Sequence, residues 1–108
     1  VEPDARRRAL ALALGADAAL EPGPALAAQI RSLNDGRLAD LALEASGAPP
    51  ALQQAIDSVQ DEGTVVVASW YGRKPVSLDL GARFHRGRIR LRSSQVGRLA
   101  PETWPRCD

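Results

Sequence analysis

The chain of 108 residues has the length of one ordinary domain, and 44% apolar with 25% charged residues is the composition of a globular fold rather than a disordered tail. A single Cys and a single His exclude an intrachain disulfide and a Cys- or His-rich metal site. No apolar run approaches the roughly 20 residues of a membrane span. The N-terminus also lacks the apolar stretch of a secretory signal, so we expect a soluble, cytoplasmic protein with no membrane partner.

The N-terminal third predicts two helices with a short strand between them. Residues 4–15 are rich in Ala and Leu, with Asp4 placed as an N-cap and Gly15 as a stop signal. A brief strand is expected near 18–21, before a Pro-Gly-Pro turn. A second helix is predicted over residues 25–33, where apolar residues recur at helical spacing.

The rest of the chain predicts three strands, a helix and a crossover. Residues 38–45 are apolar and short enough for a buried strand, and residues 51–59 have the apolar spacing of a helix. The β-branched run within 64–69 predicts a strand that is buried on both faces. A short helical or irregular stretch around 78–84 then leads to a last strand near 89–94.

This alternation of helices and strands predicts an α/β fold with a parallel sheet. In such sheets ligands bind beyond the carboxyl ends of the strands. Here those ends, at residues 45–47, 68–70 and 93–95, are rich in small or hydroxyl side chains. Such residues let a ligand approach the backbone and offer hydrogen bonds. For any one of these ends the alternative interpretation is simple closure of a tight turn.

Charge is distributed unevenly along the chain. Residues 1–67 carry a net charge of −5 and residues 68–108 carry +6, with most of the excess in the arginine-rich segment 83–92. Such a segment can bind phosphates, so a small interaction module for nucleic acid or a protein partner is an alternative function. The other interpretation is a solvated edge strand, in which Ile89 and Leu91 point inward and the arginines outward. The four aromatic residues form no interleaved array, which argues against nucleic acid.

Several segments together resemble the medium-chain, zinc-type alcohol dehydrogenases. The resemblance begins at Glu2, which precedes a basic helix, and covers nearly all of the chain in the family's order. The similar segments are Leu-Gly-Ala-Asp at 14–17, Asp-Leu-Ala-Leu-Glu-Ala-Ser-Gly at 40–47, Ala-Leu-Gln-Gln-Ala-Ile at 51–56, Gly-Thr-Val-Val-Val at 63–67 and the stretch from Phe-His-Arg at 84–86 to Ser-Ser-Gln-Val at 93–96.

The resemblance implies a partial Rossmann-like fold and a nicotinamide cofactor. Glu2 is similar to the family's acidic residue that accepts hydrogen bonds from the adenosine ribose, and Arg7 is similar to a basic position near that ribose. A carboxylate there favours NAD, while the three consecutive arginines at 6–8 keep NADP as the alternative. The residues expected along the nicotinamide half are Ala45, Ser46, Ser69, Trp70, Ser93 and Ser94.

The departures from the family pattern imply that residues 1–108 form one partial nucleotide-binding domain. The chain has neither the Gly-rich phosphate loop nor the Cys- and His-bearing zinc domain, so it resembles an enzyme whose catalytic residues and zinc ligands it does not carry. We expect part of an alcohol dehydrogenase that is inactive alone and binds its cofactor weakly or not at all. Strand edges left without neighbours predict a homo-oligomer.

Overall fold

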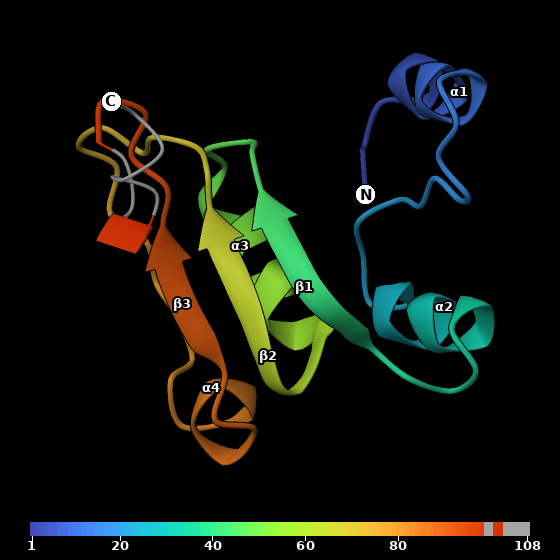
Figure 1. Cartoon of the computed structure of the whole chain (residues 1–108). Helices are drawn as coiled ribbons and strands as arrows, with labels where there is room; N and C mark the ends of the chain where they lie inside the picture. The colour runs from blue at the N-terminus through green and yellow to red at the C-terminus, as the bar shows by residue number, and fades with distance from the viewer. Residues whose placement is uncertain (99–100, 103–108) are drawn as a thin grey trace.

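Three parallel strands form the centre of the fold in the computed structural model, which describes residues 1–98 and 101–102 (Figure 1). Trp104 and Cys107 lie outside the described residues. The elements, in chain order, are α1 (Ala5–Ala13), α2 (Leu26–Leu33), β1 (Ala39–Glu44), α3 (Pro49–Asp57), β2 (Val59–Val67), α4 (Arg83–Arg86) and β3 (Arg90–Ser93).

The sheet has the strand order β1-β2-β3 and confirms the predicted parallel α/β architecture. Ala42 of β1 pairs with Val65 of β2, which in turn pairs with Leu91 of β3. Paired residues of a parallel sheet point to the same face, so these three side chains lie on the face that α3 covers. The predicted strands in the middle and C-terminal parts of the chain are therefore present, with bounds that differ by a few residues.

β2 begins five residues before the β-branched run that predicted it, because it contains a sharp bend. Two residues along β1, from Ala39 to Leu41, correspond to five along β2, from Val59 to Thr64. Gly63 lies in this bend, where a Cβ would come within 2.7 Å of the Gln60 carbonyl oxygen. Glycine is therefore required sterically, and the bend returns the strand to its register with β1.

The core lies between the sheet and α3. Its buried residues are Leu52, Ile56, Val59, Val65 and Ile89. Pro49 and Pro50 open α3 in the first turn, where a missing N–H costs no helical hydrogen bond. The helix thus crosses from the end of β1 to the start of β2 and buries its apolar side on the sheet, behind the strands in Figure 1.

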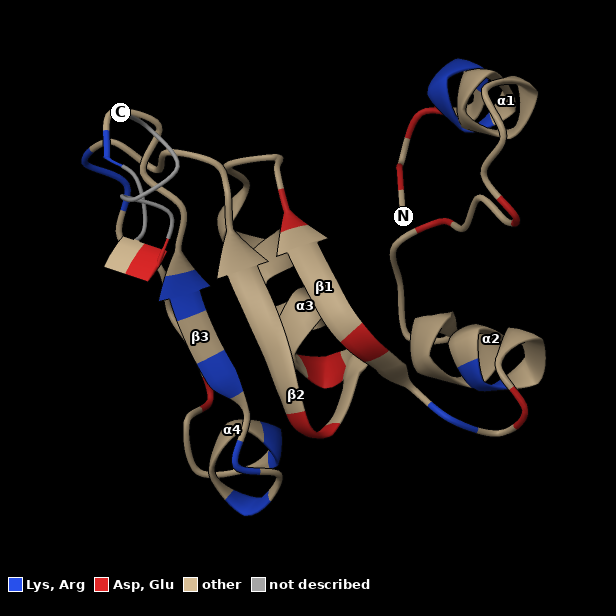
Figure 2. Cartoon of the chain, in the orientation of Figure 1, with Lys and Arg blue, Asp and Glu red and all other residues tan. Residues whose placement is uncertain are grey.

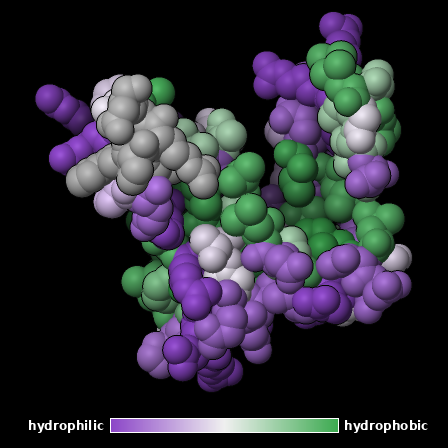
Figure 3. All heavy atoms as spheres, in the orientation of Figure 1, coloured by the Kyte–Doolittle hydropathy of each residue, from purple (hydrophilic) through white to green (hydrophobic). Residues whose placement is uncertain are grey.

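The opposite face of the sheet is uncovered by the described residues, which corrects the prediction of strands buried on both faces. Leu41 and Leu43 are 54% and 68% exposed, and Val66 is only half-buried. Apolar side chains gather over the sheet in this view (Figure 3). Alternation along a strand predicts which residues share a face, but burial requires a second layer, and here only α3 provides one.

The strand predicted near 18–21 is absent, and this expectation is wrong. The segment makes one backbone hydrogen bond to the N-terminal residues, from the N–H of Glu2 to the carbonyl of Leu20 at 2.8 Å. Arg8 adds a second link, because its guanidinium donates to the Glu2 carbonyl and to the Glu21 carboxylate. A strand needs a hydrogen-bonded ladder, and one backbone bond does not form one.

The two N-terminal helices stand beside β1 rather than on the sheet (Figure 1). In α1, the Asp4 carboxylate accepts hydrogen bonds from the N–H groups of Arg6 and Arg7, as its predicted N-cap role requires. α1 buries no residue, and α2 buries only Leu26. Local caps and hydrogen bonds therefore hold these two helices in place more than packing against the core does.

The stretch around 78–84, predicted as helical or irregular, is irregular up to residue 82, and the helix α4 (Arg83–Arg86) begins at its end. Arg83 explains this position, since it donates to the Val59 carbonyl and to Asp61 and so anchors the helix to the start of β2. In the part of the chain that the structure describes, no helix has both the length and the apolar character to cross a membrane.

Candidate functional site

The carboxyl ends of the strands lie together at one edge of the sheet, as the parallel topology requires (Figure 1). The loop after β1 contains Ala45, Ser46 and Gly47, and the loop after β2 contains Ser69 and Trp70. The predicted residues of the first two strands are thus brought to adjacent loops. This edge is the candidate site.

Glu44, the last residue of β1, is the centre of the edge. Its side chain is buried, with the residue only 4% exposed. The Oε1 oxygen accepts hydrogen bonds from the Ser46 N–H at 2.7 Å, the Ser46 hydroxyl at 2.6 Å and the Gly47 N–H at 3.2 Å. The Oε2 oxygen accepts from the Ser69 hydroxyl and from the Tyr71 hydroxyl at 2.6 Å. We call Glu44, Ser46, Gly47, Ser69 and Tyr71 the carboxylate cluster.

The hydrogen bonds determine the charge state of this cluster. Burial by itself raises the pKa of Glu44, but the hydroxyl groups of Ser46, Ser69 and Tyr71 outweigh it and lower the pKa to about 2. Burial and the adjacent Glu44 carboxylate raise the pKa of Tyr71 to about 12. Near neutral pH the cluster therefore holds a carboxylate anion and a neutral phenol.

Ser46 and Ser69 direct their hydroxyl protons into the protein. Sequence analysis expected both hydroxyls to offer hydrogen bonds to a ligand, but in the structure both donate to Glu44. The Ser46 oxygen also accepts a hydrogen bond from the Ala48 N–H at 3.1 Å. The most exposed large side chain of these loops is Trp70, at 89%.

Ser93 and Ser94 continue the edge at β3 but take no part in the cluster. Ser93 pairs with Val67 in the sheet, and the Ser94 N–H donates to the Val67 carbonyl at 2.9 Å. Both residues are exposed. They extend the candidate site along the sheet edge as a third strand end.

Glu2 belongs to the N-terminal segment and Arg7 to α1, and both of these elements lie away from this edge (Figure 1). Their side chains form an ion pair with 3.6 Å between the Arg7 Nη1 and Glu2 Oε1 atoms. Glu2 is partly buried, whereas the Arg7 side chain is largely exposed. The structure brings these two predicted residues together with each other but not with the carboxylate cluster.

Glu44, Tyr71 and Lys74 were not among the residues predicted from the sequence. The signal was a charged residue directly after the apolar run 41–43 at the end of β1, because a buried carboxylate needs several donors and the hydroxyl-rich strand ends supply them. Lys74 adds a second link between the loops, since its ammonium donates to the Gly47 carbonyl at 2.5 Å and lies 5.8 Å from the centre of the Tyr71 ring.

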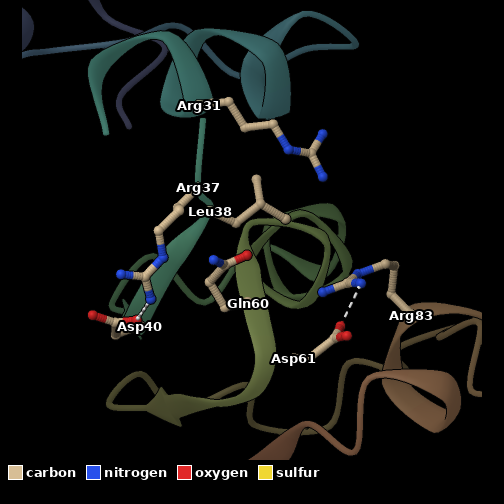
Figure 4. A pocket seen from close by; sticks show the side chains of 7 residues that line it. All are labelled: Arg31, Arg37, Leu38, Asp40, Gln60, Asp61 and Arg83. Atoms are coloured by element: carbon tan, nitrogen blue, oxygen red, sulfur yellow. Dashed lines mark hydrogen bonds and ion pairs between the residues drawn. The ribbon is translucent and has the colours of Figure 1, made fainter. Parts of the chain in front are cut away.

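A cavity of about 370 Å³ lies near the opposite, amino-terminal end of the sheet (Figure 4). Three arginines reach it, but two of them already have acidic partners: Arg37 pairs with Asp40 at 3.2 Å and Arg83 with Asp61 at 2.8 Å. These pairs cancel most of the positive charge. The cavity is therefore a weaker candidate than the edge at the carboxyl ends.

In the arginine-rich segment 83–92, which is coloured blue at its basic residues in Figure 2, three arginines form ion pairs with acids of the bend in β2. Besides the Arg83 pair, Arg88 contacts the Glu62 carboxylate at 3.1 Å, and Arg90 contacts it at 3.7 Å. Ile89 is buried, as the period-two pattern predicted, but Leu91 is 37% exposed, so the prediction is wrong for Leu91, which α3 leaves uncovered at this edge strand. Three of the five arginines of this segment are thus paired with acids, as the interpretation of a solvated edge strand expects.

The residues present do not fit a catalytic zinc ion. Across residues 1–98 and 101–102, no three His, Cys, Asp or Glu side chains gather as a ligand set. Catalytic zinc sites use three protein ligands drawn from His, Cys and carboxylates, and the whole sequence offers one Cys and one His.

Comparison with known proteins finds similarity over almost the entire chain. Residues 1–107 match the family described as zinc-binding dehydrogenase. The L-threonine 3-dehydrogenase of Pyrococcus abyssi is 38% identical over 79 residues, which are 72% of this chain and 22% of that protein. The chain thus spans less than a quarter of the length of this relative.

Two solved structures share the fold. An alcohol dehydrogenase zinc-binding domain protein from Burkholderia ambifaria has 29% identity and a TM-score of 0.72, over 89% of this chain and 26% of that one. The 2R,3R-butanediol dehydrogenase of Bacillus subtilis has 25% identity and a TM-score of 0.74, over 87% of this chain and 26% of that one.

Proposed function

Because this chain belongs to the zinc-binding dehydrogenase family, we propose that it forms one flank of the nicotinamide cofactor site of an NAD(P)-dependent alcohol dehydrogenase. The observation that carries the proposal is the set of carboxyl strand ends at one edge of a parallel sheet, where cofactors of this fold class bind. The reaction of the whole enzyme is hydride transfer between an alcohol and the nicotinamide.

Glu2 and Arg7 are proposed as the contacts of the adenosine ribose. The Glu2 carboxylate can accept hydrogen bonds from ribose hydroxyls and repels a 2′-phosphate. Its ion pair with Arg7 supports NAD over NADP, because it occupies the guanidinium that a 2′-phosphate would need. NADP remains the alternative, because the neighbouring Arg6 and Arg8 are of the residue type that binds a 2′-phosphate.

The nicotinamide half is proposed to lie along the edge formed by the three strand ends. Since the hydroxyls of Ser46 and Ser69 donate to Glu44, the contacts offered there are backbone groups of Ala45 and the exposed Trp70. Ser93 and Ser94 extend this edge and have exposed side chains. The indole of Trp70 would shield one side of a nicotinamide ring from water, which suits the apolar face of that ring.

By itself the 108-residue chain is proposed to catalyse no turnover and to hold the cofactor weakly. Its one Cys and one His supply no zinc ligand set, and its glycines form no G-x-G-x-x-G phosphate motif. Alcohol-dependent reduction of NAD⁺ by the purified chain would contradict this proposal.

The binding proposal is tested by NMR titration of the chain with millimolar NAD⁺. We expect the shift changes to gather at residues 45–47, 69–70 and 93–94 and at Glu2, since weak ligands still report their site. Glu2→Gln should reduce the response at the N-terminal segment, whereas Asp17→Asn, the same charge change on an exposed loop residue, should not. Shift changes confined to the arginine-lined cavity at the other end of the sheet would overturn the assignment.

A further inference from the structure

The two oxygens of Glu44 divide their partners between two loops. Every donor to Oε1 comes from the loop after β1, namely the Ser46 N–H and hydroxyl and the Gly47 N–H. Both donors to Oε2 come from the loop after β2, namely the hydroxyls of Ser69 and Tyr71. Ser69 and Tyr71 lie 25 and 27 residues after Glu44 in the sequence, so one carboxylate bridges two loops that are distant along the chain.

Backbone and lysine contacts reinforce the same bridge. The Glu44 carbonyl accepts from the N–H groups of Ala68 at 2.8 Å and Ser69 at 3.2 Å. In the same direction, from the segment after β2 to the loop after β1, the Lys74 ammonium donates to the Gly47 carbonyl. The first loop cannot move far from the second without breaking several charge-assisted hydrogen bonds together.

We infer that Glu44 is a positioning residue whose carboxylate couples the loops after β1 and β2 into one unit and so sets the shape of the cofactor-facing edge. The consequence for the cofactor rests on the proposed function, whereas the coupling itself is a property of the chain alone. Glu44 is not a proton carrier in this role, because it is buried and both oxygens are already occupied by donors from the protein.

The coupling is tested by changing one loop and observing the other. Ser69→Ala and Tyr71→Phe each remove one donor to Oε2 and leave Glu44 in place. We expect amide hydrogen exchange at Ser46 and Gly47, in the other loop, to become roughly tenfold faster or more in each variant, because one hydrogen bond to a charged group is lost.

Ser58→Ala is the matched control. The Ser58 hydroxyl also makes one partly buried hydrogen bond, to the Gln54 carbonyl at 2.6 Å, but it lies at the end of α3 and not in the cluster. Exchange at Ser46 and Gly47 that rises equally in Ser58→Ala would report general loss of stability and would overturn the inference. No change in Ser69→Ala and Tyr71→Phe would overturn it as well.

The contact between the loops also has a spectroscopic signature, since Tyr71 is the only tyrosine of the chain. In Glu44→Gln we expect the ultraviolet titration of the phenol to move from a pKa of about 12 toward the ordinary value of 10. An unchanged titration in folded Glu44→Gln would contradict the bridge. If Glu44→Gln fails to fold, hydrogen exchange in Ser69→Ala and Tyr71→Phe still tests the coupling.

The NAD⁺ titration separates this inference from the proposed function. If the coupling positions the edge, shift changes at residues 45–47 should weaken by several fold in Ser69→Ala and not in Ser58→Ala. Equal NAD⁺ responses in these two variants would show that the coupling does not position the edge for the cofactor. If the unmodified chain shows no response at any residue, the proposed function of this chain fails, and the exchange result still confirms or refutes the coupling.

Discussion

At the scale of single residues, Glu44 is the costliest side chain to bury and the one with the most complete set of partners. An isolated buried carboxylate would be neutral or strongly destabilising, but five hydrogen bonds keep this one charged. Four of the donors are on residues within three positions of a strand end, where small polar residues also close turns. The same residues that form the loops thus satisfy the carboxylate.

The depressed pKa of Glu44 predicts acid sensitivity. The group titrates near 4.5 in the unfolded chain and at about 2 in the folded chain, so its contribution is complete above pH 4.5 and is lost as the pH falls toward 2. The charged form of Glu44 contributes at most roughly 3 kcal/mol to the free energy of unfolding.

Urea unfolding at pH 6 and at pH 3 measures this contribution. We expect Glu44→Gln to be less stable than the unmodified chain at pH 6 and to lose less stability on going to pH 3. Asp57→Asn, an exposed carboxylate outside the cluster, is the control and should follow the unmodified chain. Parallel pH profiles for the unmodified chain and Glu44→Gln would contradict the assignment of the acid-sensitive group.

At the scale of elements, the bend in β2 determines whether the sheet keeps its register. β2 first pairs with β1 at Val59, bends through Glu62 and Gly63, and pairs again from Thr64. Glu62 adopts a φ of 65° in the bend, and its carboxylate forms ion pairs with Arg88 and Arg90. The bend therefore sets the register of β2 with β1 and also binds the arginine-rich segment through Glu62.

Gly63→Ala is expected to destabilise the fold by about 1–3 kcal/mol, because the new methyl group would lie 2.7 Å from the Gln60 carbonyl and 3.0 Å from the Val59 side chain. Gly81→Ala is the matched control, since its Cβ would meet nothing closer than 3.8 Å. Thermal unfolding of both variants measures the difference. Equal midpoints would show that the bend relaxes to admit a side chain.

The elements that sequence analysis predicted well are those with a strong local pattern. The N-cap at Asp4 and the β-branched run after Gly63 both specify their structure with neighbours a few residues away. The strand near 18–21 failed because a strand exists only through a partner ladder. The position of α4 also depends on distant partners, since Arg83 is placed by contacts with Val59 and Asp61.

At the scale of the whole molecule, the sheet has one covered face and one bare face within the described residues. β1 and β3 each pair on one side only, with β2, and Leu41 and Leu43 add apolar surface beside the open edge of β1. Open edges and exposed apolar patches favour association with another chain. We therefore propose that the chain forms a homo-oligomer through these surfaces.

Size-exclusion chromatography with light scattering over a range of concentrations tests this proposal. We expect the apparent mass to rise with concentration and to fall toward that of the monomer in Leu41→Lys/Leu43→Lys, because charges on an edge strand oppose pairing. Leu10→Lys, at an equally exposed position of α1, should leave the association unchanged. A constant monomer mass for the unmodified chain would refute the proposal.

Apart from the absent strand near 18–21, the sequence by itself determined the kinds of elements, their order and the parallel sheet, because periodicity, caps and β-branching act over a few residues and alternation then restricts the topology. It also located Ser46 and Ser69 at the edge where the strands end. Only the tertiary structure decided where their hydroxyls point, since Glu44 and Tyr71 meet across 27 residues of chain. A buried charge selects its donors in space, and no local pattern records which loops the fold brings within reach of it.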